Sequence, residues 1–220
     1  MKKLLIALWV FLPFVAMAQS EWERPEKSRK SQTSQVSQRK GLPQTEEVGE
    51  QAKYLAGAVP MVDGKVVFTL DIDVKDKDVQ QIYDIVYEKL DEMASGSNQF
   101  EESQVALVNK QEHVIAARFR EWLVFKNSVL SLDRSVFNYT IIAKCSDGHL
   151  NLTLSRISYA YEMDRKDTGG GFQTSAEEWI TDKYALSKDQ TKLNKHSGKF
   201  RRKTIDRKDE IFELIANALK

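Results

Sequence analysis

The feature that most constrains the fold is a change of hydrophobic period near residue 75. Before it, every second residue is apolar, in the order Val66, Phe68, Leu70, Ile72 and Val74. Such alternation predicts a strand with one buried face, and this strand begins at Gly64. After it, apolar residues recur at helical spacing as far as Ala94. This spacing predicts an amphipathic helix that Asp76 or Asp78 caps.

Four antiparallel strands are expected after this helix. The first covers about 104–108, a longer one follows the polar stretch 109–112, and the next spans about 136–146. The longer strand carries Glu121 out of its apolar pattern. Asp147-Gly148 then predicts a hairpin, because both residues tolerate the positive φ of a type I′ turn. The last strand starts directly after that turn.

The last strand changes its apolar face part-way along. By simple alternation one face carries Leu150, Leu152 and Leu154, and the other carries Ile157, Tyr159 and Tyr161. A slip of one residue usually marks a β-bulge, which we expect near Ser155 or Arg156. The strand should therefore be long and bent.

The C-terminal part is predicted to be helical. A glycine-rich loop at 169–171 leads to a short helix over about 175–185, and a basic connector leads to a final helix over about 206–219. The element order is strand, helix, four strands, helix. That order predicts an α+β fold in which two helices pack on one face of a curved antiparallel sheet, and the opposite face stays largely solvated.

Four motifs resemble those of a family of secreted Bacteroidota proteins that carry a domain of unknown function. They are Gly64-Lys65-Val66-Val67-Phe68, Tyr139-Thr140-Ile141, the Asp147-Gly148 turn leading to Ile157-Ser158-Tyr159, and Glu177-Glu178-Trp179. The resemblance covers roughly residues 64 to 220. It implies the TATA-box-binding-protein-like (TBP-like) fold described for that family. It implies no activity and no functional residues, because the family has none assigned.

The first residues have the pattern of a cleavable signal peptide. Lys2 and Lys3 precede an apolar run over 4–15, and Ala16-Met17-Ala18 places small residues where a signal peptidase cleaves. The run is too short to span a bilayer of roughly 30 Å permanently. We expect cleavage after Ala18 and a mature chain in the periplasm or outside the cell. No cysteine follows the cleavage point, so a lipoprotein is not expected.

Residues 19–60 are predicted to be a disordered polar tail and linker. Residues 20–49 contain too few apolar residues to offset the entropy of ordering, whereas residues 51–60 are more apolar and could pack loosely on the domain. Residues 64–220 are predicted to form a single α+β domain, with its core over 64–162 and its C-terminal helical part over 175–220. Cleavage removes two of the 33 basic residues and leaves 31 against 32 acidic ones. This balance does not steer the protein toward nucleic acid, so no nucleic-acid partner is expected.

No residues have the spacing of a catalytic or metal site. Cys145, Asp147 and His149 lie close together, but they straddle a tight turn and lack an oxyanion hole and an orienting group. The three histidines have no second ligand at metal-binding spacing. We therefore expect no enzyme activity, no cofactor and no metal. The single cysteine is expected to be a small buried hydrophobe, although an exposed thiol would allow two chains to be joined.

Two groups of residues are candidates for a binding site. A basic patch beside the final helix would suit an anionic ligand such as a phosphorylated lipid head group, or would be a solvated connector. It consists of Lys199, Arg201, Arg202, Lys203, Arg207 and Lys208. An aromatic set on neighbouring strands would bind a sugar, peptide or lipid if it were exposed, and would otherwise pack in the core. It consists of Trp122, Tyr139, Tyr159 and Tyr161.

Three functions stay open at this point. The favoured one is a non-catalytic binding or assembly module of the bacterial cell envelope, with an envelope protein or a glycan as its partner. The second is a carrier that holds a lipid-like ligand between helices and sheet, although large inward residues such as Phe68, Leu70, Phe119 and Leu123 would fill that space. The third is a hydrolase of unrecognised type.

Overall fold

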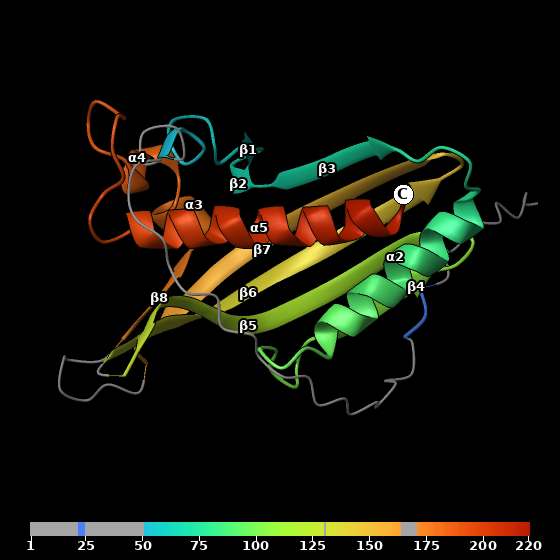
Figure 1. Ribbon diagram of the computed structural model, residues 1–220, viewed down its shortest axis with the longest axis horizontal. Coiled ribbons are helices and arrows are strands. Elements are labelled where there is room, and N and C mark those ends of the chain that lie inside the picture. Colours follow the sequence, from blue (N-terminus) through green and yellow to red (C-terminus); the bar gives the residue numbers. More distant parts are fainter. Residues whose placement is uncertain (1–21, 25–50, 130, 164–170) are drawn as a thin grey trace, which may run out of the picture.

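The computed structural model describes residues 22–24, 51–129, 131–163 and 171–220, which form an antiparallel sheet with its long helices on one face (Figure 1). The strand order is β3-β7-β6-β5-β4, and β8 also pairs with β7. The strands are β3 (Phe68–Asp73), β4 (Gln104–Asn109), β5 (Val114–Ser128), β6 (Ser131–Ser146), β7 (His149–Tyr161) and β8 (Phe172–Ser175). A separate short hairpin joins β1 (Met61–Val62) to β2 (Lys65–Val66). The predicted α+β fold is confirmed. The strand predicted from Gly64 is divided into β2 and β3, and β1 and β8 are additional strands.

Helix α2 (Val79–Ala94) starts where the sequence predicts. The Asp78 side chain accepts a hydrogen bond from the backbone N–H of Gln81, and the Gln81 side chain accepts one from the N–H of Asp78. This reciprocal pair satisfies two donors that a helix start leaves unpaired. Asp147 Oδ1 accepts a hydrogen bond from Val79 N at 2.9 Å, so the predicted hairpin turn also holds the start of α2.

The C-terminal helices differ from the prediction. Helix α5 (Gly198–Ala218) begins well before residue 206, because Phe200, Thr204 and Ile205 recur at helical spacing and are buried. The basic connector therefore supplies the first turns of the helix. The single helix predicted over 175–185 is wrong: α3 (Ala176–Trp179) and α4 (Asp182–Ala185) are separate, because Thr181 adopts extended backbone between them.

The predicted β-bulge is present in β7. Thr140 pairs with Ser155 and Asn138 pairs with Ser158, so two residues of β7 lie opposite Tyr139. Arg156, the first of the two, has a φ of 53°. The extra residue shifts the alternation of side chains by one position, so odd-numbered residues after it take the face that even-numbered residues occupy before it. As a result Ile157 and Tyr159 are buried on the same face as the leucines that precede them.

The core fills the space between the helices and the inner face of the sheet. Helices α2 and α5 contribute Ile82, Val86, Leu90, Ile211 and Ile215, all of which are buried. On the sheet side Phe68, Phe119 and Leu123 are buried in the same cluster, and Leu70 packs against it. On the other face, Asn138 and Thr140 remain partly exposed. The prediction of one buried and one solvated face is therefore confirmed.

The folded body extends beyond the predicted boundary at residue 60. Tyr54 and Val59 are buried in the core cluster, although the sequence analysis placed them in the linker. The reason is Arg201, whose Nε and Nη2 donate hydrogen bonds of 2.6 Å to the backbone carbonyls of Tyr54 and Leu55. The predicted signal peptide, most of the predicted tail, and residues 169–170 of the glycine-rich loop lie outside the described residues. Within the described ranges, no helix is long and apolar enough to cross a membrane.

Candidate functional site

The six basic residues predicted as one patch do not form one. Arg201 is fully buried, lies 2.7 Å from Asp182 Oδ1, and also donates to the Ile180 carbonyl. Lys208 is paired with Asp209, its neighbour on α5. Arg207 turns inward to the sheet. Helical spacing separates these residues onto different sides of α5. Arg201, Arg207 and Lys208 therefore have partners within the protein instead of a ligand, and Lys199 has one too, Asp133.

Arg207 is paired with the one residue that was out of pattern in β5. Glu121 is 0% exposed and lies on the inner face of the sheet. Arg207 donates from Nε to Glu121 Oε1 at 2.8 Å and from Nη2 to Oε2 at 3.0 Å. The Tyr139 hydroxyl donates to Oε1 at 3.1 Å, and Gln99 Nε2 donates to Oε2 at 2.5 Å. The buried carboxylate is therefore fully hydrogen-bonded, as burial of a charge requires.

The surroundings of this pair shift two pKa values. Burial opposes the charge on Arg207, but the hydrogen bonds and charge of Glu121 outweigh that effect and hold the pKa of Arg207 above its ordinary value. Burial, together with the nearby Glu121 carboxylate, raises the pKa of Tyr139 well above its ordinary value. The phenol therefore stays protonated and serves as a hydrogen-bond donor.

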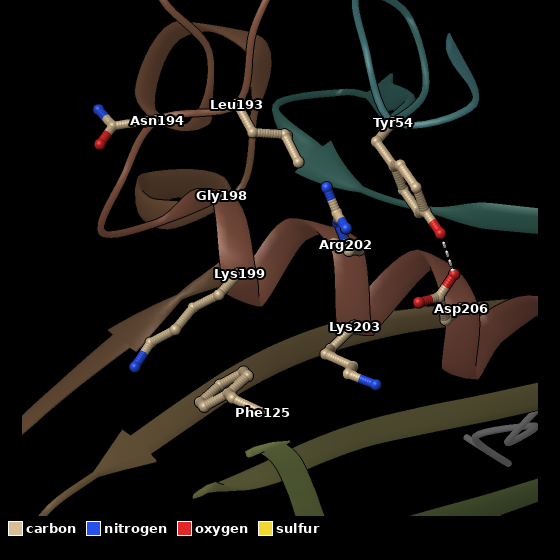
Figure 2. Close-up of a pocket in the computed structure, with 9 residues that line it drawn as sticks. All are labelled: Tyr54, Phe125, Leu193, Asn194, Gly198, Lys199, Arg202, Lys203 and Asp206. Carbon is tan, nitrogen blue, oxygen red and sulfur yellow. Dashed lines mark hydrogen bonds between the residues drawn. The ribbon is translucent and has the colours of Figure 1, made fainter. Parts of the chain in front are cut away.

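The remaining cations of the predicted patch line a groove. Lys199, Arg202 and Lys203 of α5 border a hollow of about 550 Å³, opposite Phe125 of β5 and Tyr54 (Figure 2). Arg202 reaches toward Leu193 and Tyr54, whereas Lys199 and Lys203 flank Phe125 (Figure 2). The groove thus has a cationic helix on one side and aromatic rings beside it.

Lys199 is held at one end of this groove. Its Nζ lies 2.8 Å from Asp133 Oδ2 and 3.0 Å from the Tyr161 hydroxyl oxygen. It also lies 4.6 Å from the ring centre of Phe125 and 4.4 Å from that of Tyr161. Asp133 therefore compensates its charge, and two rings surround it.

Asp206 is held at the other end. It accepts a hydrogen bond of 2.6 Å from the Tyr54 hydroxyl, and Lys53 Nζ lies 2.9 Å from the same carboxylate. Burial and the Asp206 hydrogen bond raise the pKa of Tyr54 above its ordinary value. The hydrogen bond to Asp206 likewise raises the pKa of Lys53. Because Lys53 compensates Asp206, this carboxylate does not neutralise the cations between the two ends.

Arg202 and Lys203 lie between these two compensated ends. The Arg202 guanidinium is 5.1 Å from the ring centre of Tyr54. In the described part of the chain, no carboxylate lies within ion-pair distance of Arg202 or Lys203. Lys203 also borders a second hollow of about 330 Å³ that contains Trp122, Leu123 and Arg207. Two uncompensated cations therefore face solvent-filled space beside aromatic rings.

The predicted exposed aromatic face does not exist. Tyr139 and Tyr159 are buried on the inner face of the sheet, where the Tyr159 hydroxyl lies 2.7 Å from Thr204 Oγ1. Tyr161 follows them on that face and contacts Lys199. Trp122 is on the opposite face, with the Arg134 guanidinium 3.6 Å from its ring centre. The alternation of β5 and the bulge of β7 place these side chains on two faces, so the alternative of core packing applies to Tyr139 and Tyr159.

The sequence neighbours Cys145 and His149 do not come together as a reactive pair. Cys145 is buried, and burial raises the pKa of its thiol to about 12. His149 contacts two carboxylates of β3 instead, with Nε2 at 2.7 Å from Asp71 and Nδ1 at 3.1 Å from Asp73. Among the described residues, no group of His, Cys, Asp and Glu side chains could hold a metal ion.

The sequence reasoning missed Tyr54, Phe125 and Asp206 as residues of the groove. Tyr54 lay in the predicted linker, and Asp206 lay at the predicted start of the final helix. The one available signal was the apolar character of residues 51–60, which is unusual beside the polar stretch before it. No local pattern links these positions, because their proximity depends on the docking of α5 against β5.

The chain is similar to one family of proteins and to solved structures. Residues 68–160 match a family model described as a domain of unknown function (DUF4468) with TBP-like fold. The crystal structure of a DUF4468 family protein from Bacteroides ovatus is 40% identical, with a TM-score of 0.69 over 77% of this chain and 94% of that one. The chain belongs to the DUF4468 family.

A second solved structure agrees on the fold of this DUF4468 protein. It is a TBP-like protein from Parabacteroides distasonis that is 16% identical, with a TM-score of 0.56 over 73% of this chain and 96% of that one. No curated protein matches the chain. The resemblance drawn from the sequence motifs is thereby confirmed for family, fold and Bacteroidota relatives. The groove beside α5 has to be interpreted from its own chemistry.

Proposed function

We propose that this DUF4468 protein is an exported, non-catalytic binding module of the cell envelope that holds an anionic group in the groove beside α5. The observation that carries the proposal is the pair of cations, Arg202 and Lys203, that face the groove without a described carboxylate partner. An anion placed there would gain charge-assisted hydrogen bonds from both side chains.

The walls of the groove favour an anion that is attached to a planar or apolar body. Phe125 and Tyr54 offer ring faces and edges beside the cations, and Leu193 adds an aliphatic contact. A volume of about 550 Å³ is in the range of small-molecule sites. We therefore propose a phosphate or carboxylate group on an envelope glycan or protein as the ligand chemistry.

The lipid carrier is the weaker alternative. Its ligand would need space between helices and sheet, and Phe68, Phe119 and Leu123 occupy that space in the core cluster. Two buried groups give the hydrolase alternative no support: Cys145 is buried, and the Glu121 carboxylate accepts hydrogen bonds from Arg207, Tyr139 and Gln99. These arguments support a module that binds and does not react.

The binding test uses the chain from Gln19 to Lys220 and phenyl phosphate as the probe. Backbone amide shifts of residues 198–206 should move on titration, and inorganic phosphate should bind more weakly because it lacks the ring. Lys203→Gln and Arg202→Gln should each weaken binding roughly fivefold, the loss of one charge-assisted hydrogen bond.

Lys144→Gln is the matched control, since Lys144 is exposed on β6. It should leave binding unchanged. If Lys144→Gln and Lys203→Gln lose the same affinity for phenyl phosphate, the loss comes from the change in net charge alone. That result would refute the site. The absence of any shift at residues 198–206 in the unaltered chain would refute it too.

Export is a separate part of the proposal and rests on the signal-peptide pattern of residues 1–18. Fractionation of the host, followed by N-terminal sequencing of the protein, tests it. The expected result is a chain that begins at Gln19 in the envelope or medium. A full-length chain in the cytoplasmic fraction would refute export without affecting the groove.

A further inference from the structure

A short N-terminal segment pairs with the outermost strand of the sheet. The backbone N–H of Glu23 donates to the Val108 carbonyl at 2.7 Å, and the N–H of Val108 donates to the Glu23 carbonyl at 2.8 Å. Lys110 Nζ lies 3.0 Å from Glu23 Oε2. Figure 1 shows the segment as the short blue piece beside β4. The start of the mature chain thus reaches a strand far away in sequence.

This strand has an edge that would otherwise present unpaired backbone groups. β4 is the last strand in the order β3-β7-β6-β5-β4. Its sequence, Gln104–Asn109, is largely apolar, and Leu107 is 38% exposed. An apolar edge strand is a template for pairing with another chain, so proteins usually cover or break such edges.

The pairing is confined to a short segment. Glu23 makes an antiparallel bridge, so Arg24 lies opposite Leu107 in register. The next residue in the sequence is Pro25, which has no N–H to donate and cannot extend a ladder. The described segment therefore covers the Val108 end of the edge.

We propose that the β4 edge is a docking site for an extended peptide strand, and that residues 22–24 of the same chain are its resident occupant. In such strand addition, backbone hydrogen bonds provide most of the binding affinity. The Lys110–Glu23 ion pair adds a side-chain contact here. Residues 25–50 join the segment to the domain, so pairing within one chain outcompetes pairing with a second copy. The segment keeps two β4 edges from meeting.

The test is amide hydrogen exchange of Val108 in the chain 19–220. Glu23→Pro removes the N–H that bonds to the Val108 carbonyl, and it should accelerate exchange of the Val108 amide on the order of fivefold or more. Glu23→Gln is the matched control because it keeps the N–H and loses only the charge. It should leave the Val108 amide protected.

Two further measurements of Val108 exchange show whether residues 22–24 of the same chain are the occupant. Protection of Val108 in the unaltered chain should not change on dilution; a loss on dilution would show that the occupant comes from a second copy and would overturn pairing within one chain. A peptide of residues 19–26 added to Glu23→Pro should restore protection at Val108. If Glu23→Pro leaves Val108 exchange unchanged, or the peptide restores nothing, the proposal fails.

Discussion

At the residue scale, the most unusual feature is a buried carboxylate that interrupts an apolar strand. Arg207 donates hydrogen bonds to both oxygens of Glu121, and Tyr139 and Gln99 each donate to one of them. The pair joins α5 to β5 next to the groove, because Arg207 also borders the smaller hollow. The partners come from α5, from β6 and from the loop between α2 and β4, so this cluster fixes how the helix sits on the sheet.

Replacing Arg207 with Met should destabilise the protein by about 3 kcal/mol, because the variant leaves the Glu121 charge buried without its counter-ion. Glu121→Gln in the same chain removes that charge and keeps an acceptor for Tyr139. The double variant should therefore be more stable than Arg207→Met alone. Urea unfolding of both chains measures the difference. If the double variant is no more stable than the single one, the uncompensated charge is not the cause.

At the element scale, the β-bulge of β7 decides which side chains reach the core. Without the extra residue at Arg156, Ile157 and Tyr159 would face solvent. Their burial adds an apolar side chain and an aromatic ring to the region where α5 begins. The bulge lies between the half of β7 that pairs with β3 and the half that pairs with β8.

The conformation of Arg156 predicts an opposite response to two substitutions. Its φ of 53° lies in the left-handed region, which costs a side-chain-bearing residue about 1 kcal/mol and costs glycine nothing. Arg156→Gly should therefore be neutral or slightly stabilising, whereas Arg156→Val should destabilise. Thermal unfolding of the two variants measures this. Equal destabilisation by Gly and Val would contradict the left-handed backbone at this position.

A histidine on β7 makes the attachment of β3 sensitive to pH. The hydrogen bond to Asp73, with further help from Asp71, raises the pKa of His149 above its ordinary value. Protonated His149 therefore favours the folded state. The contribution is fully present below pH 6.5, the ordinary histidine value, and is lost as the pH rises through the raised folded value.

Urea unfolding between about pH 5.5 and 8.5 tests this prediction. The range extends about one unit below and about two units above the ordinary histidine pKa. The difference in midpoint between the unaltered chain and His149→Gln should be largest at the acid end and should vanish toward the alkaline end. A difference that grows with pH would contradict the assigned sign.

At the scale of the whole molecule, the groove exists because three distant parts of the chain meet there. Tyr54 comes from the segment before β1, Phe125 from β5, and the cations from α5. Arg201 holds the first of these parts to the helix through two backbone carbonyls. The same helix thus lines the groove with its cations and packs its apolar side chains into the core, so loss of the helix should abolish both.

Local patterns in the sequence determined α2, the long strands and the hairpin of this protein, but not the start of α5 or the division between α3 and α4. Alternation set the strands, helical spacing and Asp78 set α2, and Asp147-Gly148 set the hairpin, because each depends on neighbours within a few residues. The phase slip after Leu154 even located the bulge. These features follow from backbone geometry and need no knowledge of the distant chain.

Only the tertiary structure decided which charges and rings are available to a ligand. The six basic residues look alike in the sequence, yet Arg201 and Arg207 are paired with buried or partly buried carboxylates, while Arg202 and Lys203 have no carboxylate partner among the described residues. The four aromatic residues likewise divide between two faces of the sheet. The physical reason is that burial and charge compensation depend on the packing of α5 against β5 and residues 51–60, and no local pattern records those long-range contacts.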